Sequence, residues 1–555
     1  MPASALVDDG PAGPAPLRSE RARPLLRRSR PFALVVLAGV LGVLAFPPFG
    51  FWPLAILSVA VFSVALSDCT ARRGALLGYL YGWVFFGLLL RWTGTFVGPV
   101  WLLLPFAEAG FFALLGAALV VLQRRRLAWL WIGAAWTAEE ALRDRLPFGG
   151  FPWGRWAFSQ AESPLRWFAA VGGAPLVTAV VAVAGGALAR STGWARRRHW
   201  RRGLVALAPA VTVLLVGAAL AVVLTPGRPA HRLTIALVQG NVPDRGLEFN
   251  ARRRQVLNNH VNETLRLAAE IHAGTVPKPD LVVWPENASD IDPFLNPDAR
   301  AVIDQAVAAV GVPILVGAVL DGPGPDHVSN VGIMWSPTTG PGAQYAKRHP
   351  VPFGEYLPFR AVATAITSKA ALIARDMAAG HGNGVVTGGP VPLGDVICFE
   401  VAYDGLVRSS VRGGAQLIVV QTNNATFGHS AETYQQLAMS RLRAVENRRT
   451  VVQVATSGKS AIIAPDGSIV AESGRLFTAA VIVRSVPLEQ SFTLATRVQY
   501  WPELLLSVLA AIGLAGSIIT DRRRRSRANS AGRRAADADA DADAEVSPTE
   551  ERITA

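Results

Sequence analysis

Residues 396–400 read Val-Ile-Cys-Phe-Glu, a short apolar run that ends in a cysteine and a carboxylate. Such a run is typical of a buried strand, so Cys398 is expected on the turn from a strand into a helix. Two more polar groups stand at or near strand ends: Glu286 follows Leu-Val-Val-Trp-Pro, and Lys347 opens Lys-Arg-His-Pro-Val-Pro-Phe-Gly-Glu. A thiol, a carboxylate and an ammonium group together suit nucleophilic catalysis by cysteine.

The segment around these sites, residues 229–498, alternates between short apolar runs and helical patterns. The expected strands are 233–238, 281–284, 313–319, 396–399, 417–421, 450–455 and 460–464, and the clearest helices are 252–273 and 431–447. Strand–helix alternation predicts a layered α/β domain. A segment of this length can bury a core by itself.

The rest of the chain is strongly apolar. Of the 555 residues, 51% are hydrophobic and only 17% are charged, with a net charge of +14. These values exclude a disordered protein and argue against a wholly soluble one. The surplus arginines lie beside apolar runs, so we expect no nucleic-acid partner. Eight stretches are predicted to span a membrane: 32–46, 51–66, 74–90, 100–122, 127–142, 164–188, 203–225 and 501–519.

Two alternatives remain open. The first apolar stretch could be a signal peptide, and all the apolar stretches together could form a large soluble helical core. Arginine clusters argue against the second, because they recur at every second connection, as the arginine-rich cytoplasmic loops of membrane proteins do. The resulting topology has both termini in the cytoplasm and 229–498 on the outer side. Glu108, inside the fourth span, is either a functional carboxylate or a structural partner.

The predicted organisation therefore has five parts. They are a flexible basic tail (1–30), a membrane domain with seven spans (31–226), the α/β domain (229–498), the eighth transmembrane helix (500–520) and a disordered cytoplasmic tail (521–555).

Each candidate site residue has an ordinary alternative. Glu286 could lie in a surface turn, Lys347 in a solvated charge pair, and Cys398 could be an inert buried thiol. The second cysteine, Cys69, is predicted on the cytoplasmic side, so the two cannot pair. An unpaired thiol in an exported domain is a liability unless its reactivity is used, which favours a catalytic Cys398.

The order Glu, Lys, Cys, in Pro-Glu, Lys-x-His-x-x-Pro-Phe-Gly-Glu and Cys-Phe-Glu contexts, resembles the nitrilase superfamily. The match extends to 423–428 and to the helix with Met439, Arg441, Arg443 and Glu446. Together with the spans and with the segments 46–55, 150–153 and 159–160, the chain resembles the apolipoprotein N-acyltransferase family. It departs from the family where Phe399 replaces a common tyrosine and Thr426 a common tryptophan.

This resemblance implies an eight-span helical bundle plus an α-β-β-α sandwich with a Glu286–Lys347–Cys398 triad. It implies Cys398 as nucleophile, Glu286 as base and Lys347 as stabiliser of the oxyanion. Glu355, Glu400 and Phe399 are implied as supporting residues. The implied reaction takes a fatty acyl chain from a phospholipid, through a cysteine thioester, to the α-amine of a diacylglyceryl-modified N-terminal cysteine, at a bacterial cell membrane. No cofactor and no metal are expected.

Both substrates would be lipids, so the site is expected to open towards the bilayer. The apolar stretch 357–377 is predicted to form a membrane-facing arm or lid, with a core helix and loop as the alternative. Two other functions remain open: a membrane-tethered amidase of the nitrilase type, and a catalytically silent scaffold for a membrane glycolipid enzyme.

Overall fold

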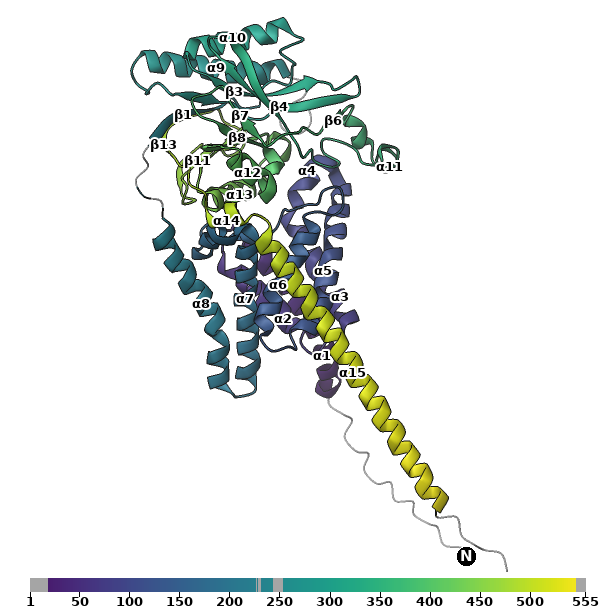
Figure 1. The fold of residues 1–555 in the computed structure, drawn as a ribbon. Helices are drawn as coiled ribbons and strands as arrows, with labels where there is room; N and C mark the ends of the chain where they lie inside the picture. The colour runs from purple at the N-terminus through teal and green to yellow at the C-terminus, as the bar shows by residue number, and fades with distance from the viewer. Residues whose placement is uncertain (1–17, 226, 228–230, 243–252, 546–555) are drawn as a thin grey trace, which may run out of the picture.

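The computed structural model describes residues 18–225, 227, 231–242 and 253–545. A helical part and an α/β part lie end to end (Figure 1). The helical part comes from both ends of the chain. Its long helices are α1 (Arg18–Leu44), α2 (Pro53–Ala65), α3 (Ala71–Leu89), α5 (Leu103–Leu122), α6 (Ala128–Arg143), α7 (Ala169–Arg196), α8 (Trp200–Leu224) and α15 (Trp501–Glu545).

Each of the eight predicted apolar stretches contributes one of these helices. Two shorter apolar helices cover the first two stretches. Within the described residues, four segments are long and apolar enough to cross a membrane, by length and composition: Gly98–Leu122, Pro164–Arg196, Trp200–Leu224 and Trp501–Arg523. A helical part suited to a membrane is therefore present, whereas the count of eight spans stays a prediction.

Glycines let α3 and α5 approach each other closely. Gly74, Gly78 and Gly82 recur at four-residue spacing on α3. A Cβ atom at Gly78 would lie 2.0 Å from the carbonyl oxygen of Phe112, and one at Gly74 would lie 2.7 Å from that of Gly116. Small residues at this spacing bring helix backbones together in lipid, where apolar side chains gain little by leaving the lipid tails.

Glu108 on α5 is buried beside Arg143 of α6, with Oε2 3.9 Å from Nη1. The same guanidinium donates hydrogen bonds to the carbonyl oxygens of Phe151 (2.6 Å) and Trp153 (2.8 Å). Of the two roles that the sequence left open for Glu108, these contacts support the structural one, because the carboxyl group lies beside the arginine that fixes the loop after α6.

Both chain ends differ from the predicted tails. Helix α1 begins at Arg18, so residues 18–30 are helical, and residues 1–17 lie outside the described residues. Helix α15 continues past position 520 to Glu545, through the arginine cluster and the Ala-Asp repeats. Alanine has the highest helix propensity, and extending a formed helix costs far less than starting one.

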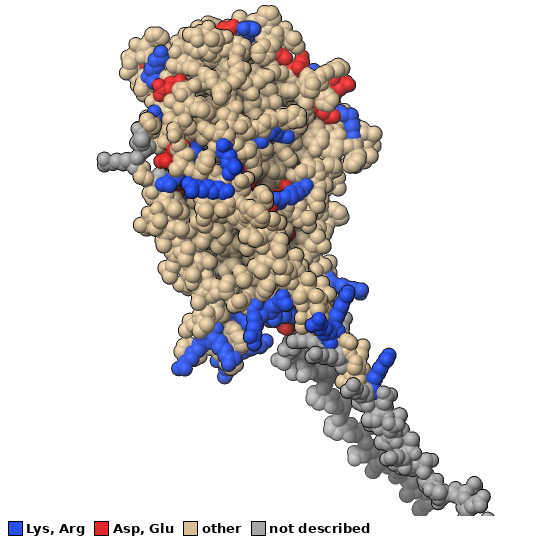
Figure 2. Space-filling view, viewed as in Figure 1, with Lys and Arg blue, Asp and Glu red and all other residues tan. Residues whose placement is uncertain are grey.

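Lys and Arg side chains gather at the end of the helical part that lies away from the α/β part (Figure 2). Arginines from separate connections meet there, since Arg124, Arg190, Arg196 and Arg197 all line one cavity of about 560 Å³. This one-sided distribution is what the predicted topology requires of its cytoplasmic end.

The α/β part contains two sheets. The first has the order β13-β1-β2-β3-β4-β5, with β6 paired to β4, and the second has the order β12-β11-β10-β9-β8-β7. The strands are β1 (His231–Gln239), β2 (Leu281–Val283), β3 (Ile314–Asp321), β4 (His327–Ser336), β5 (Gly340–Ala346), β6 (Asp376–Met377), β7 (Val385–Val386), β8 (Leu393–Ile397), β9 (Leu417–Thr422), β10 (Thr450–Ala455), β11 (Ala461–Ile463), β12 (Ile469–Glu472) and β13 (Ala480–Leu488). The seven predicted strands are confirmed as β1, β2, β3, β8, β9, β10 and β11.

The two sheets face each other between helical layers, as in an α-β-β-α sandwich. Helices α9 (Arg253–His272) and α10 (Pro297–Val310) cover the first sheet, and α12 (Asp404–Arg412) and α13 (Glu432–Asn447) cover the second (Figure 1). Side chains of β9 point alternately to the two faces of its sheet. Leu417 and Val419 pack in the core between the sheets, whereas Ile418 and Val420 pack in the core on the other face, beside α12 and α13. Because β9 is buried on both faces, it reads as a continuous apolar run.

The α12–α13 layer connects the two parts. One continuous apolar core contains Val407 of α12 and Leu442 of α13, together with Trp156, Val177 and other residues of the helical part. The second sheet, whose β8 ends at the cysteine turn, is therefore separated from the helical part by a single layer of helices.

Candidate active site

Cys398 opens a short 3-10 turn, Cys398–Ala402, directly after β8. Its φ of +54° lies in the left-handed region, which non-glycine residues rarely adopt unless their surroundings impose it. The Thr422 hydroxyl, 3.4 Å from Sγ, and the Gln436 amide nitrogen, 3.7 Å from Sγ, are placed to donate hydrogen bonds to the sulfur. The expected strand-to-helix turn is therefore present, and the thiol has two polar neighbours.

Glu286 and Lys347 lie together, both almost fully buried. Lys347 Nζ is 3.2 Å from Glu286 Oε1, which also accepts a 2.7 Å hydrogen bond from the Asn330 side chain. The second oxygen, Oε2, accepts the backbone N–H of Asn423 at 2.8 Å. These bonds hold the carboxylate in one orientation, as a general base requires.

Glu355 pairs with the lysine from the other side, since its Oε1 lies 2.5 Å from Lys347 Nζ. Its Oε2 accepts the backbone N–H of Val351 at 2.8 Å, which closes the loop that carries both residues. Lys347 is therefore held between two carboxylates, and its ammonium group has little freedom to move.

Glu400 joins the lysine loop to the cysteine turn. Its carboxylate accepts backbone N–H groups from Ile397 (2.9 Å), Arg348 (2.7 Å) and His349 (3.1 Å), and the Tyr345 hydroxyl at 2.8 Å. A carboxylate that accepts this many bonds organises two backbone segments at once. Glu400 thus fixes the geometry around the thiol without facing the reacting atoms.

Burial and neighbouring charges set the protonation states. Burial raises the pKa of the Cys398 thiol, and the Glu286 carboxylate raises it further, against the opposing effect of the Lys347 ammonium. Burial alone would lower the pKa of Lys347, but Glu286 and Glu355 raise it well above its ordinary value. At neutral pH the resting site therefore holds a thiol and an ammonium, so the thiol must lose its proton to a base when it attacks.

Phe399 lies between the turn and the helical part. Its ring is 6.0 Å from that of Trp153, nearly parallel at 9°, and 5.6 Å from that of Phe151. The phenylalanine that departs from the family pattern therefore packs as an apolar spacer. The other departure, Thr426, lies in the short 3-10 turn Ala425–Phe427.

Several polar residues of the site were missed by sequence reasoning. They are Asn330, Thr422, Gln436 and Glu432. Asn424, which lies in the matched segment 423–428, donates from Nδ2 to Glu432 at 2.7 Å and to Gln436 at 3.1 Å. Burial raises the pKa of Glu432 to about 8. The available signal was weak, because Thr422 is the last residue of β9, and Glu432 and Gln436 lie one turn apart in α13.

The geometry brings the candidate triad to one place, with Glu355 and Glu400 as neighbours. Within the residues that the structure describes, no group of three or more His, Cys, Asp and Glu side chains could hold a metal ion. The site offers a nucleophile, an oriented carboxylate and a fixed cation in a buried setting. Such a set can form and break an acyl–cysteine bond.

Two family models match the chain: the apolipoprotein N-acyltransferase N-terminal domain over residues 38–187, and carbon-nitrogen hydrolase over residues 234–493. An apolipoprotein N-acyltransferase of Mycolicibacterium smegmatis is 41% identical over 519 residues, 89% of this chain and 86% of that relative. One of Photobacterium profundum is 26% identical over 521 residues, 89% of this chain and 96% of that relative.

Among solved structures, an amidase from Nesterenkonia sp. covers 48% of this chain and 94% of its own, with a TM-score of 0.33 and 19% identity. That similarity is confined to about half of the chain. The full-length relatives, in contrast, match both the helical and the α/β parts. The chain belongs to the apolipoprotein N-acyltransferase family.

Proposed function

We propose that the protein moves a fatty acyl chain from a phospholipid, through a thioester on Cys398, to the α-amine of a diacylglyceryl-modified N-terminal cysteine. N-acyl transfer is the activity named for both full-length relatives. The observation that carries the proposal is the Cys398 turn beside a buried Lys347 held between Glu286 and Glu355.

In the first half-reaction, Glu286 takes the thiol proton as Sγ attacks the ester carbonyl of the phospholipid. The ammonium of Lys347 stabilises the negative charge that develops on the carbonyl oxygen, together with a backbone N–H after Cys398. Each such donor contributes about 10²–10³ in rate in known enzymes. The tetrahedral intermediate then loses the lysophospholipid alkoxide, which takes the proton back from Glu286, and the thioester remains.

In the second half-reaction, the α-amine of the acceptor attacks the thioester. Glu286 accepts a proton from this amine, the C–S bond breaks, and the thiolate of Cys398 takes a proton back. The products are the amide and the free enzyme. One carboxylate thus moves a proton in both directions, which fits its fixed position between Asn330 and Asn423.

The proposed topology places 229–498 on the outer face of a bacterial cell membrane. It has eight spans, seven in 31–226 and one in 500–520, and both termini in the cytoplasm. The gathering of Lys and Arg at the end away from the α/β part supports this orientation (Figure 2). The four long apolar helices support the spans.

Lipid access is proposed at an arm formed by residues 357–377. Helix α11 (Arg360–Ile366) carries side chains that are largely exposed, Val362 at 59% and Ile366 at 56%, and the adjoining Phe359 is exposed at 72%. The arm projects from the side of the α/β part nearest the helical part (Figure 1). Apolar groups exposed at that level favour contact with lipid over contact with water.

Replacement of Phe359 and Ile366 by aspartate is expected to slow acyl transfer from phospholipid about tenfold. Moving two apolar side chains out of lipid costs on the order of 1–3 kcal/mol, and the added charges increase that cost. Transfer from a water-soluble acyl thioester should change less than twofold. The exposed Leu295, which precedes α10, gives the control variant Leu295→Asp. Equal losses with both donors would contradict the arm.

Two other functions remain to be separated from this one. The amidase alternative is not favoured, because the matching full-length relatives are named as N-acyltransferases. Release of ammonia from small amides would support it. The silent scaffold would be supported if lipoproteins were fully N-acylated in cells whose protein carries Cys398→Ser.

The test is the mass of the intact enzyme after incubation with phospholipid and no acceptor. We expect one added fatty acyl group, removed by hydroxylamine and mapped to the Cys398 peptide. Addition of a diacylglyceryl-cysteine peptide should discharge it and give the N-acyl peptide. An enzyme that turns over without a hydroxylamine-sensitive adduct would overturn the thioester route.

A further inference from the structure

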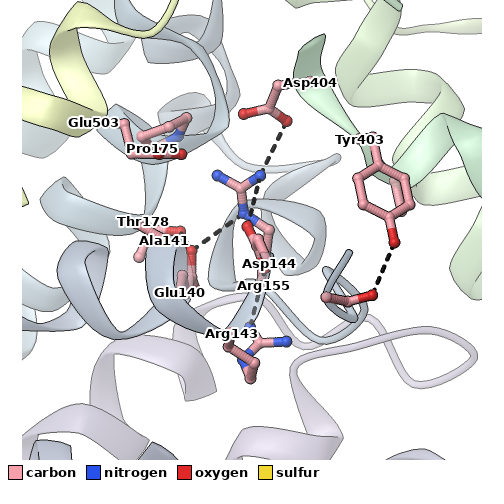
Figure 3. A network of polar contacts seen from close by, with 12 residues as sticks. Glu140, Ala141, Arg143, Asp144, Arg155, Pro175, Thr178, Tyr403, Asp404 and Glu503 are labelled. Carbon is pink, nitrogen blue, oxygen red and sulfur yellow. Dashed lines mark hydrogen bonds and ion pairs between the residues drawn. The ribbon is translucent and has the colours of Figure 1, made fainter. Parts of the chain in front are cut away.

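We propose that Arg155, Asp404 and Arg443 are positioning residues, through which the helical part holds the cysteine turn in its reactive shape. This inference rests on the proposed function, since it concerns how the same nucleophile is placed. The three side chains are named the interface ion cluster below. Figure 3 shows Arg155 between Asp404 on one side and Glu140 and Asp144 on the other.

Arg443 is the member that touches the turn. It lies on α13 with no exposed surface, and it donates from Nε to the carbonyl oxygen of Val401 (2.8 Å) and from Nη2 to that of Ala402 (2.7 Å). These are the last residues of the turn that Cys398 opens. The same Nη2 lies 2.7 Å from Asp404 Oδ1.

Arg155 extends the cluster into the helical part. Its Nη1 lies 3.0 Å from the same Asp404 oxygen and 3.2 Å from Asp144 Oδ2, while Nε lies 3.3 Å from Glu140 Oε2. Glu140 is itself fixed by the backbone N–H of Trp156 (2.9 Å) and the hydroxyl of Thr178 (2.7 Å). One carboxylate oxygen of Asp404 therefore joins an arginine of each part.

Contacts beside the interface ion cluster also connect the cysteine turn to the helical part. The Tyr403 hydroxyl, labelled in Figure 3, donates to the carbonyl oxygen of Gly150 at 2.8 Å. Burial alone would raise the pKa of Asp404, but Arg155 and Arg443 lower it below its ordinary value, so the carboxylate stays charged. The helical part thus holds the C-terminal end of the turn, while Cys398 at its N-terminal end keeps an unfavourable φ.

The physical consequence concerns rate more than affinity. A shift of the turn by a fraction of an ångström moves Sγ relative to Lys347 and Glu286, and a misplacement of about 1 Å can cost about 10² in rate. The hydrogen bonds and ion pairs given above join the interface ion cluster to the cysteine turn and to Glu140 and Asp144, not to the proposed arm, so substrate affinity should change little.

The test compares two conservative variants. Asp404→Asn keeps the shape but removes the charge, and Arg155→Lys keeps the charge but removes the planar fork. For each we expect the single-turnover rate of acyl-enzyme formation to fall 30- to 100-fold, with KM for phospholipid changed less than threefold. The double variant should be no slower than the slower single one, because residues that act through one contact are not additive.

The control is Glu162→Gln, which breaks a different ion pair between the two parts. Arg441 Nη1 lies 2.7 Å from Glu162 Oε1, and Arg441 reaches Gly467 but not the turn. We expect less than a twofold change in rate. Melting temperatures of all variants, measured in the same detergent, show how much of any loss comes from unfolding.

Two results would overturn the inference: wild-type rates in Asp404→Asn and Arg155→Lys, or losses that only follow the folded fraction and recur in Glu162→Gln. Failure of the proposed function gives a different result. In that case the wild-type enzyme itself forms no acyl adduct. A failed inference leaves the wild type forming the adduct, with the folded fraction of each variant forming it equally fast.

Discussion

Replacement of Cys398 by serine is expected to abolish N-acyl transfer, with a loss of about 10⁴-fold or more, the scale seen when a catalytic nucleophile is removed. A serine hydroxyl is far less acidic than a thiol, and the single carboxylate of Glu286 would have to remove its proton. Thr422 and Gln436 should still hold the side chain in place. Phospholipid should therefore still bind. The measurement is N-acylation of a diacylglyceryl-cysteine peptide, followed by mass spectrometry.

The matched control for this variant is the second cysteine. Cys69 is buried near the start of α3 and makes a weak bond to the carbonyl oxygen of Ala65. Cys69→Ser should change the rate less than twofold. Activity in Cys398→Ser above a thousandth of wild type, or an acyl adduct on another residue, would show that the nucleophile has been assigned to the wrong atom.

Replacement of Glu286 by glutamine is expected to slow acyl transfer about 10³-fold, within the range for loss of a general base. The amide keeps the shape of the carboxylate but cannot accept the thiol proton. The same change should make the thiol more acidic, because Glu286 raises the pKa of Cys398 and Lys347 lowers it. The variant should thus lose activity while its thiol ionises more readily.

Alkylation of Cys398 by iodoacetamide across a pH series separates these effects. In Glu286→Gln the midpoint of the pH profile should move to lower pH than in the wild type. The partly exposed Glu263 on α9, which pairs with Arg266 away from the candidate site, provides the control Glu263→Gln, which should leave both rate and midpoint unchanged. A midpoint that moves upward, or an active Glu286→Gln, would contradict the assigned role.

The candidate triad could be predicted from sequence because each member follows a recognisable pattern. Glu286 and Cys398 stand directly after apolar runs that become β2 and β8. Lys347 follows β5, which was not predicted, and was recognised instead by the Lys-x-His-x-x-Pro-Phe-Gly-Glu motif. Strands β9 and β10 were found because strands buried on both faces read as continuous apolar runs. Strands β4 and β5 were missed, since they carry polar residues and glycines.

The contacts between the two parts could not be predicted. Arg155 and Asp404 are 249 residues apart in the sequence. Hydrophobic periodicity predicts helices and strands, but it does not show which distant residue a charged loop residue will contact. The same holds for Asn330 on β4, because its bond to Glu286, which follows β2, crosses the intervening strand β3 of the sheet. For the C-terminal tail, the low-complexity composition predicted disorder. The structure instead continues α15 to Glu545, which fits the high helix propensity of alanine.

The apolar core that α12 and α13 share with the helical part has a consequence for how substrates arrive. A core continuous across the junction resists bending there, so we expect the nucleophile to stay at nearly the same height over the helices. In the proposed reaction, both donor and acceptor would therefore reach that height by lateral diffusion, one after the other. The turnover rate would then depend on how often lipid and lipoprotein encounter the site around Cys398 within the membrane plane.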